Sequence, residues 1–190
     1  MKKSNKMIWI AVALIIAAVF SRIVSSEMQW HNFAPFVAMG LFGGALFKNK
    51  SLAYLLPLGA YFLSDLYFQL STGTGFYGSS QYFVYGAMIL IVLLGSKMGQ
   101  PKAWKVLGFS IGGTLLFWLV SNFGVFAAGY YGYSFAGLIQ TYLMAIPFYT
   151  PYGSEMFFNA FIGDIIYSSI LFGAYALIKS YAFDKKVLIQ

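Results

Sequence analysis

Residues 7–23 read MIWIAVALIIAAVFSRI, an apolar segment that follows a lysine-rich start and carries one charge, Arg22. A helix needs about 20 apolar residues to cross the hydrocarbon core of a bilayer, and fewer where the bilayer is thinned. A secretory signal of this composition would be cleaved near residues 24–26, but Arg22 lies just before that position. We therefore expect this segment to be an uncleaved first membrane span.

The composition of the chain is that of a membrane protein. Of its 190 residues, 60% are hydrophobic and 9% are charged, and the mean hydropathy is +0.74. The net charge of +7 comes from lysines in short runs between apolar segments, so we expect no nucleic-acid partner. The absence of cysteine excludes disulfides, thiolate metal sites and cysteine nucleophiles.

Five further apolar segments follow the first one. The second contains Pro35, Gly40, Gly43 and Gly44, which predicts a tilted, broken or closely packed helix. Together the six segments predict an all-α integral membrane bundle of six transmembrane helices, which forms one domain over residues 1–190. The expected spans are residues 7–23, 33–47, 52–70, 82–96, 106–126 and 156–178.

The basic residues predict the orientation of the bundle, because lysine and arginine in short loops are retained on the cytoplasmic side. With both termini in the cytoplasm (N-in/C-in), only Arg22 falls on the outer side. The chain is then a multi-pass protein of the cytoplasmic (inner) membrane. The expected inner residues are Lys2, Lys3, Lys6, Lys48, Lys50, Lys97, Lys102, Lys105, Lys179, Lys185 and Lys186.

A competing count treats residues 134–148 as a seventh span. We reject that count because the segment is short, ends at Pro147 and would move the last three lysines outside. We expect instead a short interfacial helix, capped by Ser134, in the last outer loop. The outer loops at 71–81 and 127–155 are long, nearly uncharged and rich in glycine and tyrosine. A small-molecule site is therefore expected on the outer side.

Two acidic residues fall within predicted spans, and each is a functional candidate because a buried charge is costly in a membrane. Asp65, Asp164 and Arg22 each lie about 15 residues from an inner lysine, which places all three about 22–24 Å above the inner boundary. Gln81, Tyr82 and Asn122 fall near the same depth. The three charges either line an outward polar pocket or serve structurally, as an ion pair of Arg22 with an aspartate or as helix caps.

Enzymatic chemistry has little support in the sequence. No nucleotide loop, zinc spacing, nucleophile elbow or histidine-bearing triad is present, so we expect neither an enzyme nor a metal or cofactor site. His31, the single histidine, lies beside Trp30 and Asn32, where the first outer loop enters the second span. It either contacts a ligand or is an ordinary interfacial histidine.

Several motifs together resemble the substrate-binding S-components of energy-coupling-factor (ECF) vitamin transporters. The run Asn32-Phe33-Ala34-Pro35-Phe36 through Leu41-Phe42-Gly43-Gly44-Ala45 is similar to an uncharacterised bacterial family of proposed transport proteins grouped with those components. The other motifs are Ala-x-x-x-Ala at Ala13 and Ala17, the glycine-rich residues 36–47, Pro57-Leu58-Gly59 leading to Ser64-Asp65, and Gly163-Asp164-Ile165.

This resemblance implies a ligand pocket near the outer face, closed by the outer loops. It also implies that Ala13 and Ala17 contact a membrane coupling subunit that brings ATPases, and the Ala-x-x-x-Ala spacing itself permits close helix approach. No vitamin-specific motif is present, so the sequence does not predict which ligand binds. The pocket residues that the resemblance implies are Trp30, His31, Asn32, Asp65, Tyr82, Asn122, Asn159 and Asp164.

The sequence thus predicts a membrane solute-binding and uptake protein for a small vitamin-like molecule, dependent on a partner for energy. One alternative is a membrane scaffold or assembly subunit that transports nothing. A more remote alternative is an intramembrane aspartyl protease, because Asp65 and Asp164 are both predicted within spans. The residues around the two acids differ from the motifs of those proteases.

Overall fold

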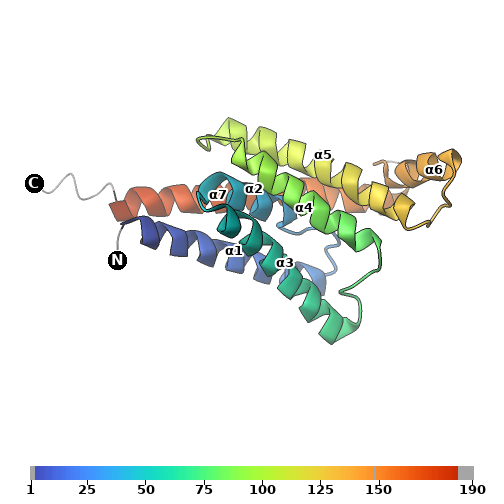
Figure 1. The fold of residues 1–190 in the computed structure, drawn as a ribbon, viewed down its shortest axis with the longest axis horizontal. Coiled ribbons are helices and arrows are strands. Elements are labelled where there is room, and N and C mark those ends of the chain that lie inside the picture. Colours follow the sequence, from blue (N-terminus) through green and yellow to red (C-terminus); the bar gives the residue numbers. More distant parts are fainter. Residues whose placement is uncertain (1–2, 148, 184–190) are drawn as a thin grey trace, which may run out of the picture.

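The computed structural model describes residues 3–147 and 149–183, and over these residues all regular secondary structure is helical (Figure 1). The all-α prediction is confirmed. Four residues on which predictions depended, Lys2, Phe148, Lys185 and Lys186, lie outside the described part. The helices are α1 (Lys3–Glu27), α2 (Phe36–Leu46), α3 (Lys50–Thr72), α4 (Ser80–Ser96), α5 (Ala103–Ala127), α6 (Phe135–Ala145) and α7 (Pro151–Phe183).

Three helices are long and apolar enough to cross a membrane, and they identify the chain as a membrane protein. Each coincides with a predicted span, and the three segments are Lys6–Glu27, Ala103–Ala127 and Pro151–Tyr181. Three more helices, α2, α4 and α6, are apolar but shorter.

The helices form a ring around α2. Each of α1, α3, α4, α5 and α7 packs on two neighbours, so that the ring closes where α1 meets α7, and α2 contacts all five. Every residue of α2 from Phe36 to Gly44 is buried. A helix that is apolar on all sides is stable in such a position, because it has no polar face to leave exposed.

Glycines allow α2 to approach its neighbours closely, as the sequence predicted. A Cβ atom at Gly44 would lie 2.9 Å from the amide nitrogen of Ser96, and one at Gly95 would lie 2.8 Å from Cα of Leu41. The backbones of α2 and α4 are therefore in direct contact, which is how small residues stabilise helix pairs in membranes.

α2 is shorter than the predicted span 33–47. It starts at Phe36, directly after Pro35, which occupies the N-cap position. A proline disfavours helical conformation in the residue before it, so the helix does not extend back into Phe33 and Ala34. Eleven residues rise about 16 Å, roughly half of a hydrocarbon core. The chain therefore reaches α2 through the non-helical residues 28–35.

The two ends of the ring differ. Figure 1 shows that α1 starts and α7 ends at the same end of the molecule, where the α2–α3 and α4–α5 connections also lie. The helix α6 lies at the opposite end and packs on α5 and α7. Its N-cap is Ser134, whose Oγ accepts a hydrogen bond from the amide of Gly137 at 3.1 Å, so the predicted cap is confirmed.

Candidate functional site

An ion pair joins α1 to α3. Nη1 of Arg22 lies 2.7 Å from Oδ1 of Asp65, and the two side chains are 15% and 0% exposed. Nη1 also donates to the hydroxyl of Ser64, and Nη2 donates to the hydroxyl of Tyr61 at 3.2 Å. The guanidinium lies over the Tyr61 ring, with Cζ 4.0 Å from its centroid. Its charge is therefore met by a carboxylate, and two of its five N–H groups donate to hydroxyls.

The second oxygen of Asp65 is held by α4. Oδ2 accepts hydrogen bonds from Nε2 of Gln81 at 3.1 Å and from the hydroxyl of Tyr85 at 2.7 Å. Gln81 also donates to the carbonyl of Gly75 at 3.3 Å, which ties the 73–79 loop to this cluster. Tyr82, the predicted residue of this helix, is 78% exposed and turned away from Asp65. Asp65 is thus enclosed by protein on both sides.

Asp164, on α7, has different partners. Its Oδ1 accepts from the backbone amide of Val37 at 3.2 Å, and its Oδ2 accepts from the hydroxyl of Thr114 at 2.7 Å. Val37 belongs to the first turn of α2, where the N-cap residue Pro35 provides no side-chain hydrogen bond. Asp164 therefore caps α2 from another helix, and a carboxylate suits this position because it faces the positive end of the helix dipole.

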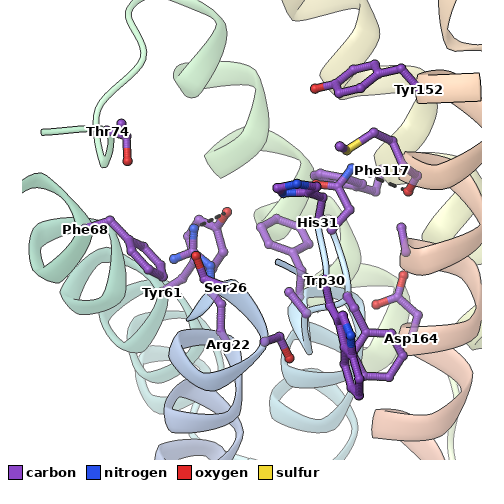
Figure 2. Close-up of a pocket in the computed structure, with 17 residues that line it drawn as sticks. Arg22, Ser26, Trp30, His31, Tyr61, Phe68, Thr74, Phe117, Tyr152 and Asp164 are labelled. Carbon is purple, nitrogen blue, oxygen red and sulfur yellow. Dashed lines mark hydrogen bonds between the residues drawn. The ribbon is translucent and has the colours of Figure 1, made fainter. Parts of the chain in front are cut away.

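A cavity of about 530 Å³, the first cavity, lies between Arg22 and Asp164. Figure 2 shows Arg22 and Asp164 on opposite sides of it, with His31 between them. Aromatic side chains supply much of the remaining wall. The lining residues are Arg22, Ser25, Ser26, Trp30, His31, Asn32, Phe33, Ala34, Phe36, Tyr61, Phe68, Thr74, Phe117, Tyr152, Met156, Ala160 and Asp164.

A second cavity, of about 720 Å³, adjoins the first and extends under residues 130–153. Burial raises the pKa of Tyr77, on its wall, above the ordinary tyrosine value, so this phenol stays neutral at physiological pH. Among its other lining residues are Ser80, Thr114, Trp118, Asn122, Tyr130, Tyr131, Thr141 and Thr150. Both cavities are lined by Arg22, Asn32, Tyr61, Phe117, Tyr152, Met156 and Ala160.

The structure brings together five of the eight predicted pocket residues. Trp30, His31, Asn32 and Asp164 line the first cavity, and Asn32 and Asn122 line the second. Asp65, Tyr82 and Asn159 line neither cavity.

The remaining predicted residues have other positions. Nδ2 of Asn159 donates to the carbonyl of His31 at 2.9 Å, so this side chain anchors the loop that carries the histidine. Ala13 and Ala17 are both exposed on the surface of α1. No group of three histidine or acidic side chains within the described ranges could hold a metal ion.

Several lining residues were not predicted. Phe36 and Phe117 pair with ring centroids 4.6 Å apart, and Thr114 contacts Asp164. A long-range contact of this kind leaves no local pattern in the sequence. In contrast, Gln81 and Tyr85 are four residues apart and so share one helix face, a spacing that could have identified both as neighbours of an acid.

These features define a class: a helical membrane protein with a polar and aromatic cavity near one end of a closed helix ring. The chain belongs to DUF6580, a family of unknown function whose sequence model matches residues 2–186. No curated protein and no solved structure matches the chain.

Proposed function

We propose that this protein binds a small vitamin-like solute on the outer side of the cytoplasmic membrane and takes part in its uptake. The first cavity is the observation that carries this proposal. Its volume of about 530 Å³ lies within the usual range for small-molecule sites. Its wall combines charged, amide and imidazole groups with aromatic rings, which is the mixture that binds and orients a polar, flat ligand.

The proposal includes six membrane crossings with both termini in the cytoplasm, in which α2 with residues 28–35 forms the second crossing. Non-helical backbone is tolerated at membrane depth where protein buries it or where it lines a cavity, as residues 33 and 34 do. Exposed lysines at the α2–α3 and α4–α5 connections, among them Lys48, Lys97 and Lys102, support a cytoplasmic position for that end. The cavities then open to the outside.

Energy for uptake would come from a partner, because the sequence contains no nucleotide-binding loop. We propose an S-component-like arrangement in which a membrane coupling subunit with ATPases contacts α1. The exposed positions of Ala13 and Ala17 support this, since small residues permit close approach of another helix.

One observation favours a second candidate function, a scaffold subunit without a ligand. Asp65 is sealed by Arg22, Gln81 and Tyr85, as expected of a residue that holds the bundle together. The protease alternative has no such support. The two acids share no hydrogen-bond partner among the described residues, whereas an aspartyl protease needs both acids at one shared water.

A ligand screen by thermal shift in detergent tests the proposal. A ligand at about 100 times its dissociation constant stabilises the folded state by about 2.7 kcal/mol. Ala160 lines both cavities, and Ala160→Leu should fill part of this space. Ala176, exposed on the same helix, provides the control Ala176→Leu.

Compounds that stabilise the native chain and Ala176→Leu, but not Ala160→Leu, would support binding in the cavities. Uptake of the radiolabelled compound by cells expressing the protein would then test transport. If no vitamin-like compound stabilises the native chain, the scaffold function is favoured.

A further inference from the structure

The charge of Asp164 is not matched by a basic side chain. Among the described residues the ion pair of Asp65 with Arg22 is the only one, so no lysine, arginine or histidine there neutralises Asp164. The N-terminus of α2 offsets about half of an elementary charge. Asp164 is therefore an acidic group on the wall of the first cavity that has no basic partner among the described residues.

The carboxylate also retains unused acceptor positions. Two carboxylate oxygens offer about four lone-pair sites. Asp164 accepts from the amide of Val37 on one oxygen and from the hydroxyl of Thr114 on the other. One acceptor site on each oxygen thus has no hydrogen-bond partner among the described residues.

Arg22, on the opposite side of the cavity, does not create a matching preference for an anion. Its guanidinium is paired with Asp65 at 2.7 Å and also donates to Ser64 and Tyr61. An anionic ligand at Arg22 would have to compete with a fully buried carboxylate. The Arg22 side of the cavity is therefore close to neutral, and the acidic group without a basic partner lies on the Asp164 side.

The aromatic part of the wall suits a flat, positively charged molecule. Phe36 and Phe117 lie together at a centroid distance of 4.6 Å, and Trp30 and Tyr152 also line the cavity. Aromatic faces attract cations, and the attraction is strongest where water is excluded.

We infer that the first cavity takes an organic cation, with an ammonium, amidinium or pyridinium group against Asp164 and a flat apolar body against the aromatic wall. This inference rests on the proposed binding function and specifies its substrate class. It distinguishes this cavity from one that binds carboxylate or phosphate compounds.

Three probes of one shape and different charge test the inference: benzamidine, benzamide and benzoate, together with the corresponding two-ring naphthalene series. Binding to the full chain in nanodiscs is measured by thermal shift and equilibrium dialysis. We expect the amidines to bind at least ten times more tightly than the neutral amides, and the carboxylates to bind more weakly still. This comparison uses the native chain and does not depend on a variant folding.

Two variants locate the charge. Asp164→Asn removes the negative charge but keeps an acceptor for the amide of Val37, and it should weaken amidine binding at least ten-fold. Glu155→Gln removes the same charge from an exposed position on α7 that lines neither cavity, so it should leave binding unchanged.

Equal or tighter binding of the amides or carboxylates would overturn the inference while leaving a ligand-binding function in place. If no probe binds, the inference also fails. The vitamin-like screen with Ala160→Leu then decides separately whether the protein binds any solute.

Discussion

The carboxylate of Asp164 on α7 caps the first turn of α2 by accepting the amide hydrogen of Val37, 127 residues earlier in the chain. Helices in soluble proteins usually receive this cap from a neighbouring serine, threonine, asparagine or aspartate. Here the position before the helix is Pro35, so the acceptor comes from the ring that surrounds α2. One side chain thereby holds the central helix and lines the cavity.

The cap can be separated from the charge by two substitutions. Asp164→Ala removes the acceptor for Val37 and should lower the free energy of unfolding by about 1–2 kcal/mol, the usual cost of losing an N-cap. Asp164→Asn keeps an acceptor oxygen and should lose less. Thermal melting in detergent, followed by circular dichroism, measures both. Equal losses for the two variants would show that the charge, and not the cap, stabilises α2.

The ion pair of Arg22 with Asp65 should behave as a buried pair. Removing one partner leaves an uncompensated charge and costs about 3–5 kcal/mol. We therefore expect Arg22→Met and Asp65→Asn each to destabilise the protein strongly, and the double variant to be more stable than either single one. A double-mutant cycle on unfolding measures this coupling. Strictly additive losses would contradict a paired role for these residues.

Close packing of α2 on α4 gives a third prediction. A Cβ atom at Gly44 would press against the α4 backbone, so Gly44→Ala should lower stability by about 1–3 kcal/mol. Gly86, on α4, has no neighbouring atom within 4 Å of the position of a Cβ, and Gly86→Ala is the control. It should be neutral or stabilising, because alanine favours helix over glycine. The melting temperatures of the two variants and the native protein measure these effects. An unchanged melting temperature for Gly44→Ala would argue against direct contact between the backbones of α2 and α4.

The orientation can be tested by single-cysteine labelling, because the chain contains no cysteine. Ser79→Cys and Tyr133→Cys place a thiol at exposed positions near the α6 end, and Lys48→Cys and Lys102→Cys place one at the other end. A membrane-impermeant maleimide should label the first two in intact cells and the second two only after permeabilisation. The reverse pattern would place the cavities toward the cytoplasm.

Much of the fold could be predicted from the sequence, because apolar segments and caps are local features. The six predicted spans each coincide largely with one helix, and Ser134 caps α6 as expected. An ion pair of Arg22 with an aspartate was one of the alternatives that the matching depths left open, and the structure shows this pair with Asp65. The start of α2 was placed three residues too early, because hydropathy does not register the effect of Pro35 on the residue before it.

The site was less predictable, because depth along a helix does not specify the direction in which a side chain points. Gln81 and Tyr82 lie at nearly the same depth, yet consecutive helix residues point about 100° apart, and only Gln81 faces Asp65. A helix cap was one of the predicted roles of the acids, but the sequence did not indicate that Asp164 would cap α2. Its partner is a backbone amide of another helix, and a backbone amide has no signature in the sequence.

The closure of the ring between α1 and α7 has a consequence for biosynthesis. Translation produces α2 long before α7. The newly made α2 therefore lacks Asp164, the acceptor for the amide of Val37, and it lacks α7 as one of its five packing neighbours. An unpaired amide is costly in lipid. The cap and the enclosure of α2 are therefore complete only after α7 has been made, and a product truncated before α7 should be a substrate for membrane quality control.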